Sequence, residues 1–192
     1  TLSSMSSVAA GSGFMFFLES GWDPSDTGAG KTASFLRYGS MDFDTPENSL
    51  SALTPISTVS SYCHKMDAIS LDTTESHALL GVSANERGII GTPGSNLGAQ
   101  VFVVSEASGH TLVETLKNTV NTTGVKCFQH SGFGWAWFTE EGSNNTDLVR
   151  INLTDFSTVV FQIALGSDNL QGFESPEIFF YEGNPYLLAM SI

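Results

Sequence analysis

Short apolar runs separated by turn-forming residues dominate the pattern along this chain. Residues 14–18 form an apolar run of strand length, and the polar and turn-forming residues 19–24 close it. Phe133, Trp135 and Trp137 alternate with small residues, and a period of two is typical of a strand with one buried face. Sustained helical periodicity is almost absent, so the pattern predicts an all-β protein.

Further predicted strands follow the same pattern along the rest of the chain. They cover residues 32–38, 77–82, 100–104, 148–153, 159–165, 178–181 and 186–190. Residues 111–120 have room for a helical turn, but their Thr and Val residues favour a strand.

The strands recur in groups of about four, at a spacing of roughly 40 to 50 residues, which is typical of β-propeller blades. The predicted fold is a single domain, residues 1–192, built of four-stranded antiparallel blades near residues 11–60, 61–126, 127–170 and 171–192. The most blade-like unit is residues 132–165. A β-sandwich accounts for short strands equally well and stays an alternative.

Composition and charge narrow the classes of partner. The 192 residues are 41% hydrophobic, which excludes wholesale disorder. Seven basic and 20 acidic residues give a net charge of −13, which disfavours nucleic acids and anionic membranes as partners. No apolar run approaches the ~20 residues that span a bilayer, so we expect no membrane insertion.

Several features are compatible with a secreted glycoprotein. The first residue is Thr1, so we expect that a leader was removed or that the chain is a piece of a longer one. Glycosylation sequons occur at Asn121, Asn144 and Asn152, close to the number expected by chance. The only cysteines, Cys63 and Cys127, allow one disulfide at most.

Two motifs resemble cofactor or metal sites, but the sequence favours neither. Residues 28–32 look like the end of a phosphate-binding loop, yet Ser25 stands where that motif needs a glycine. Cys63 with His64, and Cys127 with His130, lack the paired spacing of structural zinc sites. We therefore expect no cofactor and no metal, and packed or disulfide-bonded cysteines.

Tryptophans are candidates for binding sugar. Trp135 and Trp137 lie two residues apart and face the same side of one strand. On an exposed face they would form a platform for the apolar faces of sugars, whereas between two sheets they would fill the core. Trp22 lies in a polar loop, where a core role is harder to assign.

The strongest local signal is the stretch of residues 173–188. It carries Glu174 at the entrance of a strand, then Pro176, an apolar strand, a turn at Gly183 and Asn184, and a second strand. A Glu at the mouth of a pocket can be desolvated, which raises its pKa for general-acid work, although a solvated surface Glu fits the spacing as well.

This stretch resembles the "E-x-P-x-(I/M)-(F/Y)-x-x-x-G-x-Y-Y-L" signature of glycoside hydrolase family 43, whose members are five-bladed β-propellers. Residues 13–18 and 32–35 are similar to the second blade of its galactan 1,3-β-galactosidase-like members. Residues 61–66, Asp72 and residues 78–80 are similar to their third blade.

The resemblance implies roles for particular residues. Glu174 would be the general acid, and Asp67, then Asp23 and Glu19, are the candidates for a second carboxylate that activates water. An inverting mechanism needs carboxyl groups about 6.5–9.5 Å apart. The resemblance also implies a carbohydrate ligand, an extracellular location and an incomplete propeller, which the same precursor or another chain would complete.

Two other functions stay open. A non-catalytic binding or structural propeller is compatible with Lys65, which stands where the relatives carry an acidic residue. A β-sandwich adhesin with an inter-sheet disulfide between Cys63 and Cys127 is the third possibility.

Overall fold

All regular elements in the described part of the chain are β-strands. The computed structural model describes residues 5–19, 35–40, 53–56, 63–73, 76–84, 98–116, 122–140, 145–164 and 173–191. Their strands form three four-stranded sheets and one two-stranded sheet. The expectation of an all-β chain with four-stranded antiparallel sheets is confirmed.

Each sheet is a meander in which strands that follow one another in sequence lie side by side. The first sheet contains β1 (Met5–Gly11), β2 (Phe14–Glu19), β3 (Phe35–Ser40) and β4 (Thr54–Ile56). The second sheet contains β5 (Cys63–Leu71), β6 (His77–Ala84), β7 (Gln100–Ser105) and β8 (Gly109–Thr115). The third sheet contains β9 (Thr122–His130), β10 (Phe133–Glu140), β11 (Asn145–Asn152) and β12 (Thr158–Ala164). The fourth sheet is the hairpin of β13 (Phe173–Tyr181) and β14 (Asn184–Ser191).

Two-residue turns close the first hairpin of three sheets. Both turn residues have positive φ at Ser12–Gly13, Ser131–Gly132 and Glu182–Gly183. Positive φ at both positions is the geometry of a type I′ turn, whose twist matches that of the flanking strands. The turn predicted at Gly183 and Asn184 therefore lies one residue earlier, and Asn184 begins β14.

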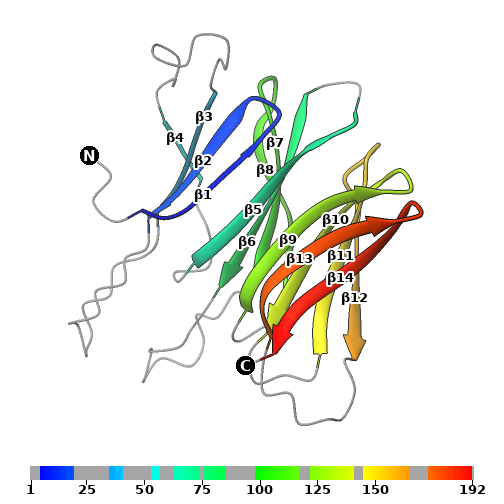
Figure 1. Cartoon of the computed structure of the whole chain (residues 1–192). Coiled ribbons are helices and arrows are strands. Elements are labelled where there is room, and N and C mark those ends of the chain that lie inside the picture. Colours follow the sequence, from blue (N-terminus) through cyan, green and yellow to red (C-terminus); the bar gives the residue numbers. More distant parts are fainter. Residues whose placement is uncertain are drawn as a thin grey trace, which may run out of the picture.

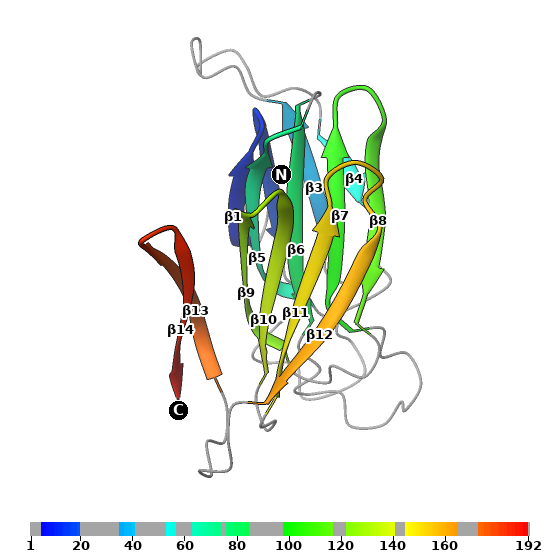
Figure 2. The same cartoon turned by 90° about the vertical axis from the view of Figure 1, so that its right-hand side faces the viewer.

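The sheets follow one another face to face, and their first strands lie next to each other (Figure 1). β5 contacts β1 on one side and β9 on the other, and β13 lies beside β9. Figure 2 shows the hairpin β13–β14 beside the inner strands of the third sheet, away from β12. We call β1, β5, β9 and β13 the inner strands.

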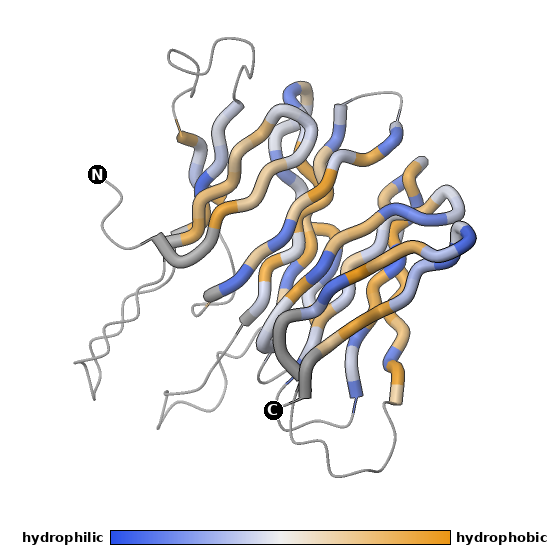
Figure 3. The backbone as a smooth tube through the Cα atoms, viewed as in Figure 1, coloured by the Kyte–Doolittle hydropathy of each residue, from blue (hydrophilic) through white to orange (hydrophobic). Residues whose placement is uncertain are grey.

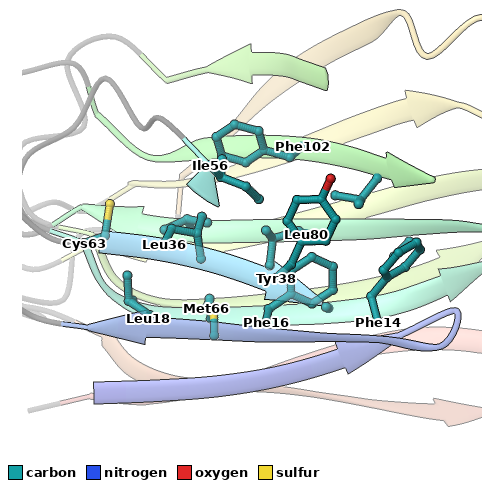
Figure 4. Packing of buried hydrophobic residues seen from close by; sticks show 14 residues of the cluster. Phe14, Phe16, Leu18, Leu36, Tyr38, Ile56, Cys63, Met66, Leu80 and Phe102 are labelled. Atoms are coloured by element: carbon teal, nitrogen blue, oxygen red, sulfur yellow. The ribbon is translucent and has the colours of Figure 1, made fainter. Parts of the chain in front are cut away.

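The first core lies between the first and second sheets. Phe14, Phe16 and Leu18 alternate along β2, and all three side chains are buried against the second sheet. Figure 4 shows them beside Leu80 and Phe102 of the second sheet. The apolar face of each sheet is thus removed from water by the next sheet, which is the main driving force for this packing.

The second core lies between the second and third sheets. It contains Leu79, Val101 and Val103 from the second sheet, and Phe138 and Ile151 from the third. Two separate cores between three sheets differ from the single core of a two-sheet sandwich.

Small residues let the inner strands approach closely. A Cβ atom at Gly11 of β1 would lie 2.7 Å from the carbonyl carbon of Ile69 in β5, and one at Gly124 of β9 would overlap the ring of Pro176 in β13. Because small and polar residues have low strand propensity, the pattern did not predict β1, β5 or β9. The expected blade boundaries at residues 11 and 127 therefore fall within β1 and β9. The predicted unit of residues 132–165 contains β10, β11 and β12 but leaves out the inner strand β9.

Candidate functional site

The inner strands bring together two carboxylates, a lysine and a cysteine. Asp67 of β5 accepts a hydrogen bond at Oδ2 from the backbone N–H of Cys127 in β9, at 2.7 Å. The thiol of Cys127 donates to the backbone oxygen of Asp67, at 3.4 Å. The next residue, Lys126, lies with its Nζ 3.2 Å from Oε2 of Glu177 in β13. We call Asp67, Lys126, Cys127 and Glu177 the inner-strand cluster.

The electrostatics of the cluster depend on partial burial. Burial raises the pKa of Asp67, although the Cys127 N–H and the charge of Lys126 oppose this rise. Burial also tends to lower the pKa of Lys126, but the carboxylates of Asp67 and Glu177 outweigh burial and raise it. Lys126 therefore stays charged between the two acids, and Asp67 holds a proton to higher pH than an exposed aspartate does.

Glu174 lies at the start of β13, where its backbone pairs with Met190 of β14. A register shift separates Glu174 from Glu177. Glu177 is the β13 carboxylate that interacts with Lys126 and influences Asp67. Sequence reasoning assigned no role to Glu177, although it lies in the same Glu-Ser-Pro-Glu stretch as Glu174.

Of the remaining candidates, Glu19, Trp22 and Asp23, only Glu19 lies within the described residues. Glu19 is the last residue of β2, where its backbone pairs with Met5 and Phe35. Trp22 and Asp23 lie outside the described residues, as does the glycine-rich loop at residues 28–32.

Trp135 and Trp137 of β10 face the side of the third sheet on which the hairpin β13–β14 lies. The half-buried Trp135 stacks on Phe128, with ring centroids 6.0 Å apart and planes at 9°. Its Nε1 donates to the backbone oxygen of His130. Trp137 is only 2% exposed, and its Nε1 donates to Oγ1 of Thr146 at 2.6 Å. Trp135 is therefore the better placed of the two for contact with a ligand.

An aromatic surface extends outward from Trp135 across the third sheet. Phe133 and Phe161 lie 6.3 and 6.2 Å from Trp135, measured between ring centroids. The guanidinium carbon of Arg150 lies 4.7 Å from the Phe133 centroid and 5.6 Å from that of Phe161. We call Phe128, Phe133, Trp135, Arg150 and Phe161 the aromatic face. Such a surface offers stacking and cation–π interactions together.

Neither cysteine forms a disulfide, and both are buried. Cys63 belongs to the first core and Cys127 to the second, so no disulfide links the sheets. Burial raises the pKa of the Cys127 thiol well above its ordinary value. Among the described residues, no group of three or more His, Cys, Asp or Glu side chains could hold a metal ion.

Comparisons with known proteins identify no family. No protein-family model matches the chain, and no curated protein matches it significantly. Within the described ranges, no helix is long and apolar enough to cross a membrane.

Proposed function

We propose that this chain forms part of a β-propeller that acts on carbohydrate as a glycoside hydrolase, with Glu174 as its general acid. Successive four-stranded antiparallel meanders with adjacent first strands are the arrangement expected of propeller blades, which supports the fold in this proposal. The stretch from Glu174 to Leu188 supports the activity through its resemblance to glycoside hydrolase family 43. The proposal also assigns the protein to the extracellular space, where polysaccharides occur.

The observation that carries the proposal is the position of Asp67. This half-buried carboxyl group lies on an inner strand, and β9 separates it from β13, which carries Glu174 as its second residue. In the proposed mechanism, Glu174 protonates the glycosidic oxygen while the ionised Asp67 activates a water molecule. Lys126 favours the ionised form of Asp67 and supports this role.

Trp135 is the proposed sugar-stacking residue. Its ring is half-buried, and its contact with Phe128 fixes the orientation of the indole plane. A rigid aromatic ring binds the apolar face of a sugar with little loss of side-chain entropy. Trp22 and Trp137 were the other candidates from the sequence, but Trp137 is buried in this structure, so Trp135 carries the binding proposal.

A non-catalytic binding propeller is the second candidate, and one observation favours it. Asp67 accepts the N–H of Cys127, and Lys126 pairs with Glu177, so the cluster links β5, β9 and β13. Charged groups that hold neighbouring strands together have a structural role, so their presence does not require a catalytic function. Lys65 on β5 agrees with a site that has lost an acid.

The test compares Glu174→Gln and Asp67→Asn with Glu182→Gln, a control in the exposed turn of the same hairpin. Release of reducing ends is measured on a panel of polysaccharides, and binding is measured on the same panel by calorimetry. We expect Glu174→Gln to lower turnover by about 10²–10⁴-fold and to preserve binding, because the amide keeps the shape and lacks the proton. The control should match the wild type.

Other outcomes separate the candidates. Wild-type binding without hydrolysis, weakened by Trp135→Ala, would favour the binding propeller. Hydrolysis that Glu174→Gln leaves unchanged would exclude Glu174 as the acid. Neither binding nor hydrolysis on any polysaccharide would overturn both functions.

A further inference from the structure

The turn from β11 to β12, residues 153–157, lies at the end of the sheets where turns of neighbouring sheets meet. The ring of Phe156 in this turn lies 4.9 Å from that of His77 in the second sheet, measured between centroids. Ser12, in the first turn of the first sheet, donates its hydroxyl proton to the backbone oxygen of His77. Figure 3 shows hydrophilic residues at the turns β7–β8 and β13–β14, which lie at this end as well. The turns at this end of the sheets therefore present polar residues to solvent.

Local hydrogen bonds give the turn from β11 to β12 a defined shape. The backbone N–H of Asn152, the last residue of β11, donates to the oxygen of Ser157 at 3.0 Å. The N–H of Phe156 donates to the oxygen of Asn152 at 2.9 Å. Oδ1 of Asp155 accepts both the N–H and the hydroxyl proton of Ser157, at 3.0 and 2.7 Å. Asn152 thus closes the turn through its backbone.

Asn152, Leu153 and Thr154 form a glycosylation sequon, and the turn separates the surroundings of their side chains. Leu153 packs against the second core, whereas Thr154 is exposed. Oδ1 of Asn152 accepts the backbone N–H of Thr154 at 2.9 Å in an exposed Asx turn, which directs the amide group along the turn rather than across the sheet. Within the described residues, Nδ2 of Asn152 donates no hydrogen bond, so a substituent on that nitrogen breaks none there.

We propose that Asn152 is a site of N-linked glycosylation, modified when the chain passes through a secretory compartment. The donor is an oligosaccharide carried on a lipid diphosphate. Nδ2 forms a bond to the first sugar carbon and loses one proton, while the bond from that carbon to the diphosphate oxygen breaks and the lipid diphosphate leaves. A bulky polar glycan is accommodated at the surface, where this turn presents the sequon.

The place of Asn152 in the fold carries this inference, because the motif by itself does not. The number of sequons in the chain is close to that expected by chance. The inference rests on the extracellular location in the proposed function, but it does not depend on hydrolysis of sugar.

The bonds that shape the sequon are available before the sheets assemble. Asn152 and Thr154 are two residues apart, and so are Asp155 and Ser157. Side-chain to backbone bonds over such short separations form without tertiary contacts and favour turns. An emerging chain can therefore present the same Asx turn to the transferring enzyme, and folding leaves that turn at the surface.

A glycan on Asn152 lies far from the proposed catalytic acid. Asn152 pairs with Phe133, which directly follows the turn from β9 to β10. β13 runs alongside β9, with Pro176 close to Gly124 near the start of both strands. Glu174, the second residue of β13, is therefore at the opposite end of the strands from Asn152. Glycosylation at this turn is compatible with a carbohydrate site near Glu174.

The test expresses residues 1–192 behind a secretion signal in a eukaryotic host. Peptide-N-glycosidase in heavy-oxygen water converts each glycosylated Asn to a labelled Asp, so peptide mass spectrometry reads Asn121, Asn144 and Asn152 separately. Asn152→Gln removes the acceptor, Thr154→Ala removes the sequon and keeps Asn152, and Thr154→Ser keeps both. Asn184→Gln is the matched control, because Asn184 is an exposed asparagine next to a turn at the same end and belongs to no sequon.

We expect label at residue 152 in most folded wild-type chains, in Thr154→Ser and in the control. Thr154→Ala should lose this label, and Asn152→Gln should lose the mass of one glycan. Chains retained inside the host are analysed as well, because transfer precedes secretion. An unlabelled Asn152 in both pools, or label confined to aggregated chains, would overturn the proposal.

Assays of hydrolysis on the same samples separate this inference from the proposed activity. A glycosylated Asn152 in a chain that hydrolyses no polysaccharide supports the modification site and counts against the hydrolase. An active chain whose Asn152 stays unmodified supports the hydrolase and overturns the modification site.

Discussion

Gly81 of β6 is the position at which one added carbon tests the packing of the second and third sheets. Its backbone pairs with Asp67, so it also lies next to the inner-strand cluster. A Cβ atom there would lie 2.6 Å from Cγ2 of Val125 and 3.1 Å from Sγ of Cys127. Ordinary carbon contacts are about 3.5–4.0 Å, so Gly81→Ala must move the facing strand by about 1 Å.

The expected cost follows from two opposing effects. Overpacking of a well-packed core costs about 1–3 kcal/mol. Loss of backbone freedom in the unfolded chain offsets about 0.4–1 kcal/mol of this, because alanine is less flexible than glycine. We therefore expect Gly81→Ala to lower the free energy of unfolding by roughly 1–2 kcal/mol. For a chain of this size, the melting temperature should fall by roughly 2–8 °C.

The assay is a double-mutant cycle of urea unfolding with Val125→Ala. That substitution removes Cγ2, so the double variant should be more stable than the sum of the single effects predicts, by about 1 kcal/mol. Strict additivity would show that the two residues do not meet. A Gly81→Ala variant as stable as the wild type would refute the close approach of β6 and β9.

Three further predictions concern buried groups. Burial raises the pKa of Asp67 above its ordinary 3.8, so its contribution to stability is greatest below that value and is lost as the pH rises through its folded-state pKa. Asp67→Asn should therefore gain stability relative to the wild type with rising pH in urea unfolding, and a constant difference would contradict the burial of Asp67. Cys127 should resist alkylation at pH 8 in the folded chain and react in denaturant, since burial raises its thiol pKa; rapid labelling of folded protein would contradict this. Trp137→Phe should cost about 1–2 kcal/mol in thermal unfolding, because it removes the buried hydrogen bond to Thr146, and a neutral effect would show that this bond contributes little.

The apolar strands were predictable because their signal is local. Residues 14–18, 100–104 and 133–137 have the β-branched, aromatic and alternating residues of half-buried strands, and they became β2, β7 and β10. The recurrence of such strands also predicted the four-stranded antiparallel sheets. Glu174 was singled out from its position before Pro176 in an apolar strand, and it is the second residue of β13 in an extended hairpin.

Only part of the inner-strand cluster could be predicted from the sequence. Asp67 came from the resemblance to a known family, but its partners could not be found from spacing, because Cys127 is 60 residues away. The only feature of the sequence that pointed to Glu177 is that it is a second carboxylate three residues after Glu174. Its importance depends on Lys126, which comes from a strand that the pattern did not predict.

The sequence by itself determined the strand-rich class, the acidic net charge and the grouping of consecutive strands into four-stranded antiparallel sheets, since each follows from residue type and from neighbours in the chain. Only the tertiary structure decided which strands lie innermost. Gly11, Gly81 and Gly124 look like poor strand residues when they are read one at a time, yet they allow strands from different sheets to approach. That approach sets Asp67 against Cys127 and Lys126 against Glu177, because contacts between sheets depend on packing across distances in sequence that no local pattern encodes.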